Sequence, residues 1–573
     1  MSLIKTRAVP ATLEKNLLAA GFNPLQARLY AARGIQNPLE LEHELKHLLP
    51  FTLLKNAPEM GARLADAIEQ GKRLLIVGDY DADGATATTL AMKGLAAFSV
   101  NSRAKVDFIV PNRFEYGYGL TPEIVELARS KSPDIIITVD NGIASHAGVE
   151  AAKAHGIEVL ITDHHLPADT LPDALIVNPN QGDCPFPSKN LAGVGVMFYV
   201  LMALRAALRE RGAFAEKTEP NLAQWLDIVA LGTVADVVKL DANNRILVEQ
   251  GLKRMRAGRA CPGIMALFTA AGRFYGRASC FDLGFTLGPR LNAAGRLDDM
   301  SFGINTLLAT SEEVALPQAK ELDQLNRSRR EIEQGMREEA ERALINVDVA
   351  DRYSISLYQA DWHQGVVGIV ASRVKDQFHR PTLVFADGSN GRGSDDDEIK
   401  GSGRSIPSLH LRDALDLVSK RHPNLIKKFG GHAMAAGLTL LRKDFAAFEA
   451  AFEAVCRELL DETQLTRIIE TDGELPSRDL QIATAELLDK QVWGQGFPAP
   501  LFSGQFRVVE QRIVGEKHSK LKLANKEGIL LEAMRFNWSE PIPRDIHAVY
   551  KISVNEFRGE RILQLQLDYC EPA

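Results

Sequence analysis

The chain has 573 residues, of which 45% are apolar and 25% charged, and its formal net charge is −7. This composition is ordinary for soluble globular proteins, and it excludes a membrane span, because no apolar run approaches the roughly 20 residues that cross a bilayer. The N-terminus shows no signal-peptide pattern, and five scattered cysteines without a CxxC pair argue against disulfides and a thiolate zinc site, so we expect a cytoplasmic protein.

Residues 74–240 alternate short apolar runs with helical stretches. Between two such runs, residues 121–130 predict a helix with Thr121 as N-cap and Pro122 at the first helical position. Alternating strands and helices predict a parallel, right-handed α/β sheet, which binds ligands beyond the carboxyl ends of its strands. Four β-branched runs predict its buried strands: 73–77, 134–139, 157–162 and 174–177.

The second half of the chain changes character twice. Residues 311–346 are charged, with apolar positions at three- and four-residue steps, and predict a long amphipathic helix that connects two α/β regions. A second, smaller α/β region is predicted from 353 to about 460, in which the polar, glycine-bearing segment 394–403 predicts a loop. After about residue 470, five short alternating runs predict a small β-barrel.

Carboxylates and histidines follow three of the predicted strands. Because parallel strands bring their carboxyl ends to one edge of a sheet, we expect these side chains to converge. Carboxylate and imidazole ligands without cysteine suit Mn²⁺ or Mg²⁺, with Zn²⁺ or Fe²⁺ open, and so many acids indicate two ions. The residues are Asp79, Asp81 and Asp83 after the first strand, Asp140 after the second, and Asp163, His164 and His165 after the third.

Two simpler interpretations compete with a metal site. An aspartate before glycine at a strand end commonly forms a turn, and TVDNG alone favours a turn. DYDADG also matches the start of a calcium-binding loop, but its twelfth position is Leu90 in place of the bidentate glutamate. Three separate strand ends that all carry ligand residues are much harder to obtain from turn statistics, so we favour the metal site.

A family resemblance extends this interpretation. DYDADG, VDNG, DHH and ALGTVADVV, the last of which contributes Asp236, resemble in order and spacing the motifs of the DHH phosphoesterase superfamily. GSGRS and GGHAMAAG resemble the companion DHHA1 domain, and ADWHQGVVGIVASR and GPRLNAAGRL narrow the resemblance to the RecJ family of single-strand-specific DNA exonucleases. The resemblance covers nearly the whole chain. It implies an N-terminal segment with a DHH catalytic domain (1–310), a connecting helix (311–346), a DHHA1 substrate-binding domain (347–465) and an OB-fold nucleic-acid-binding domain (466–573).

The resemblance also implies roles for the acidic and histidine residues. His165 is expected to contact the scissile phosphate, and Asp163 to orient a histidine. Whether Asp79 and Asp163 bind an ion directly or act through a neighbour stays open. One Mn²⁺ or Mg²⁺ ion is expected on Asp79, Asp81 and Asp140, and the second on Asp83, Asp140, His164 and Asp236.

The implied activity is 5′→3′ degradation of single-stranded DNA to 5′-mononucleotides, in DNA repair and recombination. The terminal 5′-phosphate calls for arginine forks and close backbone approach, although a lone arginine is more often a solvated surface residue. The candidates for binding DNA or phosphate are Arg113, Arg290, Asn292, Arg296, Ser402, Gly403, Arg404, Gly431 and His432.

The expected partners are single-stranded DNA and, through the resemblance alone, a single-strand-binding protein and a RecQ-type helicase; the chain is expected to be a monomer. Basic residues in 327–330, 516–522 and 556–561, with Phe557 for base stacking, are further DNA-contact candidates. An oligoribonuclease or nucleotide phosphatase of the DHH type is disfavoured because such relatives are shorter and lack the barrel. A non-catalytic DNA-binding relative is disfavoured because it would lack metal ligands.

Overall fold

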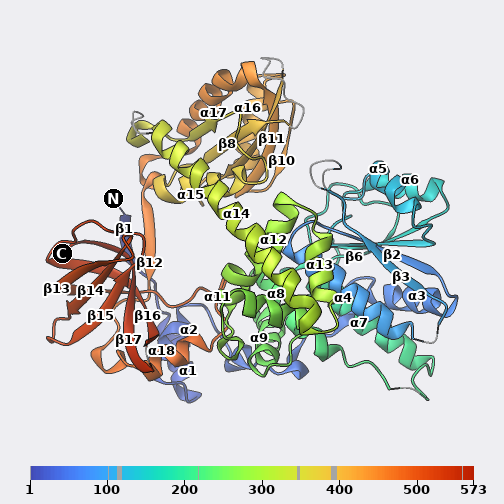
Figure 1. Cartoon of the computed structure of the whole chain (residues 1–573), viewed down its shortest axis with the longest axis horizontal. Helices are drawn as coiled ribbons and strands as arrows, with labels where there is room; N and C mark the ends of the chain where they lie inside the picture. The colour runs from blue at the N-terminus through green and yellow to red at the C-terminus, as the bar shows by residue number, and fades with distance from the viewer. Residues whose placement is uncertain are drawn as a thin grey trace. The chain divides into compact units, whose positions relative to one another are not determined.

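The computed structural model describes residues 2–100, 102–112, 116, 119–216, 218–344, 349–388, 397–557 and 559–573 (Figure 1). These residues form two compact units. The smaller unit comprises Met1–Leu3, Arg296–Asp298 and Gln324–Ile469, and the larger comprises Ile4–Gly295, Asp299–Asp323 and Glu470–Ala573. Within the described residues, no helix is both long and apolar enough to span a bilayer.

The larger unit contains a parallel sheet of five strands in the order β3-β2-β4-β5-β6. The four strands expected from the sequence are all present, and the expectation of a parallel α/β sheet is confirmed. The fifth, β3, lies at the sheet edge and is only partly buried, so it lacks the continuous apolar run of its neighbours. The strands are β2 (Arg73–Gly78), β3 (Lys105–Ile109), β4 (Ile135–Val139), β5 (Glu158–Thr162) and β6 (Leu175–Val177).

Helices cover both faces of this sheet: α5 and α6 lie on one face and α3, α4 and α7 on the other (Figure 1). The predicted N-cap of α5 is confirmed, since the Thr121 hydroxyl accepts a hydrogen bond from the Ile124 amide at 3.3 Å. The helices that lie wholly or mostly in the larger unit are α1 (Ala11–Ala19), α2 (Pro24–Ala31), α3 (Ala57–Glu69), α4 (Ala82–Phe98), α5 (Pro122–Arg129), α6 (His146–Ala154), α7 (Gly193–Glu210), α8 (Leu226–Ala235), α9 (Ala242–Arg256), α10 (Pro262–Ala270), α11 (Cys280–Asp282), α12 (Gly288–Leu297), α13 (Ser301–Leu308) and α18 (Ile482–Asp489).

The smaller unit is built on a mixed sheet in the order β10-β11-β9-β8-β7, with only β7 and β8 parallel. The expected long helix is α14 (Glu312–Leu344), which begins in the larger unit and ends in the smaller one. The elements of this sheet and its helices are β7 (Ile355–Tyr358), α15 (Val367–Phe378), β8 (Thr382–Asp387), β9 (Glu398–Arg404), α16 (Leu411–Arg421), β10 (Lys428–Gly431), β11 (Ala435–Leu441) and α17 (Phe445–Leu459).

The prediction of a loop over 394–403 is wrong, because β9 is the central strand of this sheet. Neighbouring side chains leave no room for a Cβ at two of its glycines. A Cβ at Gly401 would lie 2.4 Å from a ring carbon of Phe385, and one at Gly403 would lie 2.6 Å from Leu383. These glycines make room for large core residues. In the sequence alone they resemble the glycines of a loop. Residues 394–396 lie outside the described residues.

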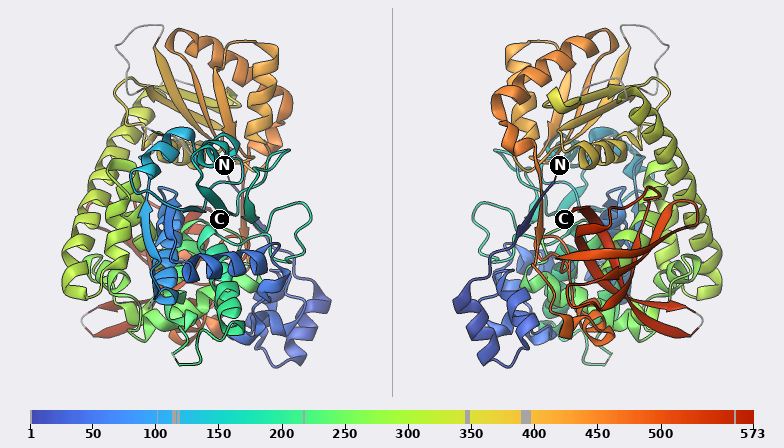
Figure 2. Two further views of the ribbon diagram at one scale, coloured as in Figure 1. Left: turned by 90° about the vertical axis from the view of Figure 1, so that its right-hand side faces the viewer. Right: turned by 90° about the vertical axis from the view of Figure 1, so that its left-hand side faces the viewer.

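The C-terminal strands close into a five-stranded barrel, as expected (Figure 2). Its core also takes Leu25 and Leu29 from α2, far away in the sequence. A separate two-stranded sheet joins β1 (Ser2–Thr6) to β12 (Arg467–Thr471). The barrel strands are β13 (Phe502–Val514), β14 (His518–Ala524), β15 (Leu530–Arg535), β16 (Asp545–Phe557) and β17 (Glu560–Pro572).

Candidate metal centre

The first acidic motif turns the chain from β2 into α4. Asp81 is the N-cap of this helix: its Oδ1 accepts hydrogen bonds from the amides of Asp83 (2.9 Å) and Gly84 (3.0 Å). The other oxygen of Asp81 makes no capping bond, so this carboxylate can cap the helix through Oδ1 and bind a cation through Oδ2. Asp79 precedes the turn and is 8% exposed.

The second motif holds Asp140 in a left-handed backbone conformation, with φ of 63°. Such a conformation is unfavourable for a residue other than glycine and persists only where the surroundings enforce it. Here the Asp140 amide donates to the Thr162 carbonyl (3.0 Å), and the side-chain amide of Asn141 donates to the carbonyls of Val77 (3.1 Å) and Val139 (2.9 Å). Asn141 thus ties the ends of β2 and β4 together beside the ligand candidate.

The expected metal ligands converge around His164. Its Nε2 lies 3.1 Å from an oxygen of Asp140, 3.5 Å from one of Asp236 and 3.9 Å from one of Asp83. Potential ligand atoms within 4.8 Å of one another form three sets: Asp79, Asp81 and Asp140; Asp83, His164 and Asp236; and Asp140, His164 and His165.

The electrostatics of this cluster favour a cation. Burial, followed by the charge of Asp81, raises the pKa of Asp83 to about 7. Burial and the neighbouring carboxylates, Asp83 foremost, raise the pKa values of Asp140 and Asp236 well above 3.8. Burial, with the charge of His165, lowers the pKa of His164 to about 4, which leaves a neutral imidazole.

These residues therefore fit a divalent cation. His164 Nε2 is buried and has no hydrogen-bond partner in the described part of the chain, while carboxylate oxygens surround it. A neutral imidazole nitrogen and carboxylate oxygens all carry lone pairs, and a positive ion among them removes their repulsion.

Asp83 is completely buried at the N-terminus of α7. Its two oxygens accept hydrogen bonds from the amides of Gly193 (2.6 Å) and Val194 (2.9 Å), where the helix dipole favours negative charge. A Cβ at Gly193 would lie 2.6 Å from Cβ of Asp140, so only glycine fits between the two carboxylates. Sequence reasoning missed Gly193; the LAGVG pattern at a helix start was the available signal.

Asp163 supports the histidines and is 1% exposed. Its Oδ1 accepts from the His164 amide (2.7 Å), the His165 amide (3.1 Å) and His165 Nδ1 (2.7 Å), and its Oδ2 accepts from the Ile143 amide (2.9 Å). Burial alone would lower the pKa of His165, but the hydrogen bond and charge of Asp163 outweigh it and raise that pKa to about 9. Although burial opposes it, His165 in turn holds the pKa of Asp163 below its usual value.

Three phosphate-binding candidates of the larger unit have other contacts or lie outside the described residues. Arg290 is buried, donates to the Thr286 carbonyl (2.6 Å) and pairs with Asp323 at 2.7 Å. Asn292 Oδ1 accepts from the Ala82 amide at 2.8 Å. Arg113 is outside the described residues.

The remaining candidates belong to the smaller unit. Arg404 is partly buried, donates to the Ser402 hydroxyl (3.1 Å) and the Gly403 carbonyl (2.8 Å), and has no carboxylate partner among the described residues. Arg296 donates to the Gly365 carbonyl at 3.0 Å. Gly431 is the last residue of β10 and His432 begins the turn to β11, in which the His432 amide donates to the Ala435 carbonyl at 2.8 Å.

Three of the other basic candidates have acidic partners within the described part of the chain. Arg329 of the 327–330 run is buried against Asn326 and Glu333, so it does not face solvent. On the barrel, Lys520 pairs with Glu532 at 2.9 Å, and Arg561 pairs with Glu486. The side chain of Phe557 lies outside the described residues.

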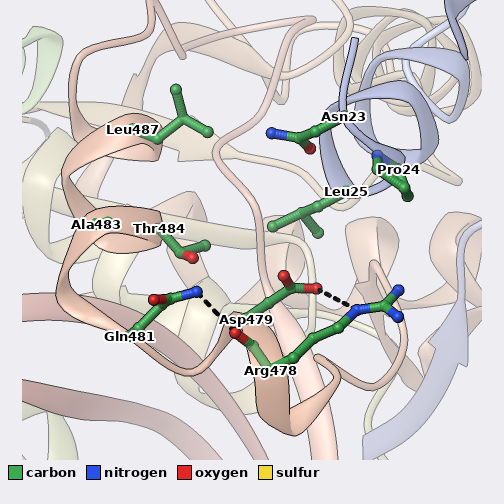
Figure 3. A pocket seen from close by; sticks show the side chains of 9 residues that line it. All are labelled: Asn23, Pro24, Leu25, Arg478, Asp479, Gln481, Ala483, Thr484 and Leu487. Carbon is green, nitrogen blue, oxygen red and sulfur yellow. Dashed lines mark hydrogen bonds and ion pairs between the residues drawn. The ribbon is translucent and has the colours of Figure 1, made fainter.

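A pocket of about 480 Å³ lies apart from the acidic cluster, between α2 and α18 (Figure 3). Arg478 and Asp479 form a loose ion pair at its edge (3.9 Å), and the Gln481 side chain donates to the Arg478 carbonyl at 2.7 Å. None of its lining residues belongs to the acidic cluster. They are Asn23, Pro24, Leu25, Arg478, Asp479, Gln481, Ala483, Thr484 and Leu487.

Known proteins resemble this chain over nearly its whole length. The models of the DHH family N-terminal domain, the DHHA1 domain and the RecJ OB domain match residues 73–233, 350–458 and 471–569. The single-stranded-DNA-specific exonuclease RecJ of Dickeya dadantii is 51% identical over 96% of both chains, and that of Escherichia coli is 48% identical over 99% of both. The chain belongs to the RecJ family of single-stranded-DNA-specific exonucleases. The expected family, fold and enzyme class are thereby confirmed.

Solved structures of RecJ from another organism contain bound metal ions. RecJ from Thermus thermophilus in complex with Mn²⁺ matches with a TM-score of 0.82 at 29% identity, covering 100% of this chain and 80% of that one. The same protein in complex with Mg²⁺ matches with a TM-score of 0.76 at 28% identity, covering 100% and 78%. Relatives of this fold therefore bind the ions that the acidic cluster fits.

Proposed function

We propose that the acidic cluster holds two Mn²⁺ or Mg²⁺ ions and hydrolyses single-stranded DNA from its 5′ end, releasing 5′-mononucleotides. The observation that carries this proposal is the convergence of two ligand sets on one sheet edge, with Asp140 adjoining both. Asp79 and Asp81 complete the first set, and Asp83, His164 and Asp236 the second. Two bound divalent ions supply water activation and charge neutralisation for phosphodiester hydrolysis.

The protein residues have separate tasks in this reaction. Water adds to phosphorus, the bond between phosphorus and the 3′-oxygen of the first nucleotide breaks, and that oxygen takes a proton. His165 is suited to contact the phosphate or supply this proton, because its hydrogen bond to Asp163 orients the ring through Nδ1 and its raised pKa keeps the imidazole protonated. The four hydrogen bonds that Asp163 accepts support a positioning role rather than metal binding.

Arg404 and Ser402 are proposed to bind the terminal 5′-phosphate. A partly buried guanidinium without a carboxylate partner is costly unless an anion joins it. Gly368 in the first turn of α15 borders this pair, since a Cβ there would lie 2.8 Å from the Ser402 hydroxyl and 3.0 Å from the Arg404 guanidinium. The helix N-terminus adds favourable potential for a phosphate.

Substitution of Asp140 tests the proposed metal centre. With Mn²⁺ and 5′-labelled single-stranded DNA, we expect the intact protein to release labelled mononucleotide, with little from matched duplex or RNA. We expect Asp140→Ala to lose nearly all activity and most bound Mn²⁺, because Asp140 adjoins both ligand sets. Retained activity and metal content in this variant would overturn the assignment, and preference for short RNA would favour the oligoribonuclease alternative.

The remaining proposals concern surroundings and partners. The barrel is proposed to extend the DNA track, as OB domains do through basic grooves. The five free cysteines suit a reducing cytoplasm. A monomeric state and binding of a single-strand-binding protein or a RecQ-type helicase are proposed from the family resemblance, and size-exclusion chromatography with each purified partner tests them.

A further inference from the structure

Helix α12 lies directly against the backbone of the first acidic motif. The side chain of Asn292, on this helix, accepts a hydrogen bond from the Ala82 amide at 2.8 Å. One turn later, a Cβ at Gly295 would lie 1.9 Å from the Tyr80 carbonyl oxygen, so only glycine allows this approach. The two contacts clamp the residues on either side of Asp81.

The Ala82 amide needs a partner from outside its own helix. The first amides of a helix have no intrahelical acceptor. Asp81 Oδ1 already serves the amides of Asp83 and Gly84, which leaves the Ala82 amide to Asn292. Asn292 therefore completes the N-terminal cap of α4 at Ala82, the residue between the proposed metal ligands Asp81 and Asp83.

Helix α12 is fixed by buried polar contacts of its own. Arg290, two residues before Asn292, forms a buried ion pair with Asp323 of α14, in which each side chain is 9% exposed. It also donates to the Thr286 carbonyl at 2.6 Å. A helix fixed in this way can transmit a defined position to the loop that it contacts.

We propose that Asn292 is a positioning residue that sets Asp81 and Asp83 for metal binding through the Ala82 amide. This inference rests on the proposed assignment of those two carboxylates as ligands. The role uses the Asn292 oxygen, which serves the Ala82 amide, whereas the phosphate contact expected from the sequence would need its side-chain NH₂ group as donor. Partners of this kind around metal ligands typically change metal affinity by about 10- to 100-fold when removed.

The test compares four variants of the full chain, Asn292→Leu, Asn292→Asp, Asn23→Leu and Asp81→Asn, by titration with Mn²⁺ alone, followed by electron paramagnetic resonance of the free ion. Asn292→Leu keeps the size but removes the acceptor, and we expect Mn²⁺ to bind about 10- to 100-fold more weakly. Asn292→Asp keeps an acceptor oxygen, and we expect affinity close to that of the unchanged protein. Asn23→Leu is the matched control, because Asn23 caps α2 through a bond of the same length, 2.8 Å, to the Gln26 amide, away from the acidic cluster.

The possible outcomes distinguish the positioning role of Asn292 from the assignment of Asp81 and Asp83 as metal ligands. Unchanged Mn²⁺ affinity in Asn292→Leu, together with weaker affinity in Asp81→Asn, would overturn the positioning role and leave the ligand assignment standing. Unchanged affinity in both would overturn both. Equal losses in Asn292→Leu and Asn23→Leu would show a general effect of lost caps and would also overturn the role. Weaker binding of single-stranded DNA in Asn292→Leu at unchanged Mn²⁺ affinity would return Asn292 to the phosphate contacts.

Discussion

Gly193 borders the proposed metal centre so closely that a methyl group there would collide with Asp140, at 2.6 Å from its Cβ and 2.7 Å from its Oδ1. We expect Gly193→Ala to displace this carboxylate and to reduce nuclease activity and Mn²⁺ affinity by at least about tenfold. Losses of this size are typical when residues that orient the ligands of a metal site are mutated. Gly195→Ala is the control, because its new methyl would meet only the flexible end of Leu191, at 3.3 Å. Equal activity in the two variants would contradict this account.

Asp163 and His165 form a pair whose charge can be tested separately from metal binding. Asp163→Asn removes the negative charge that keeps the pKa of His165 at about 9, so this pKa should fall toward or below its ordinary value. We expect kcat to fall by about 10²- to 10⁴-fold with a much smaller change in Mn²⁺ affinity, as for loss of a general acid. Activity and Mn²⁺ titrations on the same samples check this, and a parallel loss of metal would place Asp163 among the ligands.

At this scale the sequence indicates the proposed ligands better than the residues that support them. Asp140 and His164 follow recognisable strands, so their convergence follows from parallel-sheet geometry. Gly193 and Asn292 act through backbone amides of residues far away in the chain, 110 positions in the case of Gly193 and Asp83. Such contacts depend on how helices pack, which residue types and spacing do not specify.

Among the elements, β9 shows how a core strand can look like a loop. Gly401→Ala would place a methyl 2.4 Å from Phe385 and 2.9 Å from Leu438 inside the sheet of the smaller unit. Overpacking of this kind costs about 1–3 kcal/mol, so we expect a lower free energy of unfolding in urea. Gly430→Ala in β10 is the control, since no atom lies within 4 Å of its new methyl. Equal stability of the two variants would argue against a tightly packed β9.

The strands that were predicted and those that were missed differ in burial. β2, β4 and β5 are buried on both faces and give continuous apolar runs, which the sequence reveals. β3 at the sheet edge keeps polar residues, and β9 alternates buried glycines with polar residues, so neither gives an apolar run. Pattern reading therefore recovers strands with buried apolar runs, including β6 at the other edge of the sheet, more readily than polar or glycine-rich strands.

At the scale of the whole molecule, chain order and packing diverge. The sequence places residues 1–56 before the sheet, but Leu25 and Leu29 of α2 pack into the core of the barrel. Arg33 forms a buried ion pair with Asp472 at 2.9 Å, across 439 positions. Removing residues 470–573 would therefore expose the apolar side of α2 to water and remove Asp472, the partner of Arg33, so surface substitutions on the barrel test DNA binding more cleanly than its deletion.

The acidic cluster should also set how stability depends on pH. The pKa of Asp83 is raised from 3.8 to about 7, and those of Asp140 and Asp236 are raised as well. A carboxyl group with a raised pKa binds more protons in the folded than in the unfolded state. Its contribution to stability is therefore complete below pH 3.8 and is lost as the pH rises through about 7.

Mn²⁺ should reverse this trend, because it replaces protons among the ionised carboxylates. With a chelator, we expect the unfolding temperature of the larger unit to fall between pH 5 and pH 8 more steeply than in Asp140→Asn, which has one fewer of these carboxylates. With Mn²⁺ at 100 times its Kd at pH 8, we expect a gain of about 2.7 kcal/mol, and a much smaller gain from the same Mn²⁺ concentration at pH 5, where protons compete. Calorimetry at both pH values measures this difference. Equal Mn²⁺ stabilisation at pH 5 and pH 8 would mean that the ions do not bind at these carboxylates.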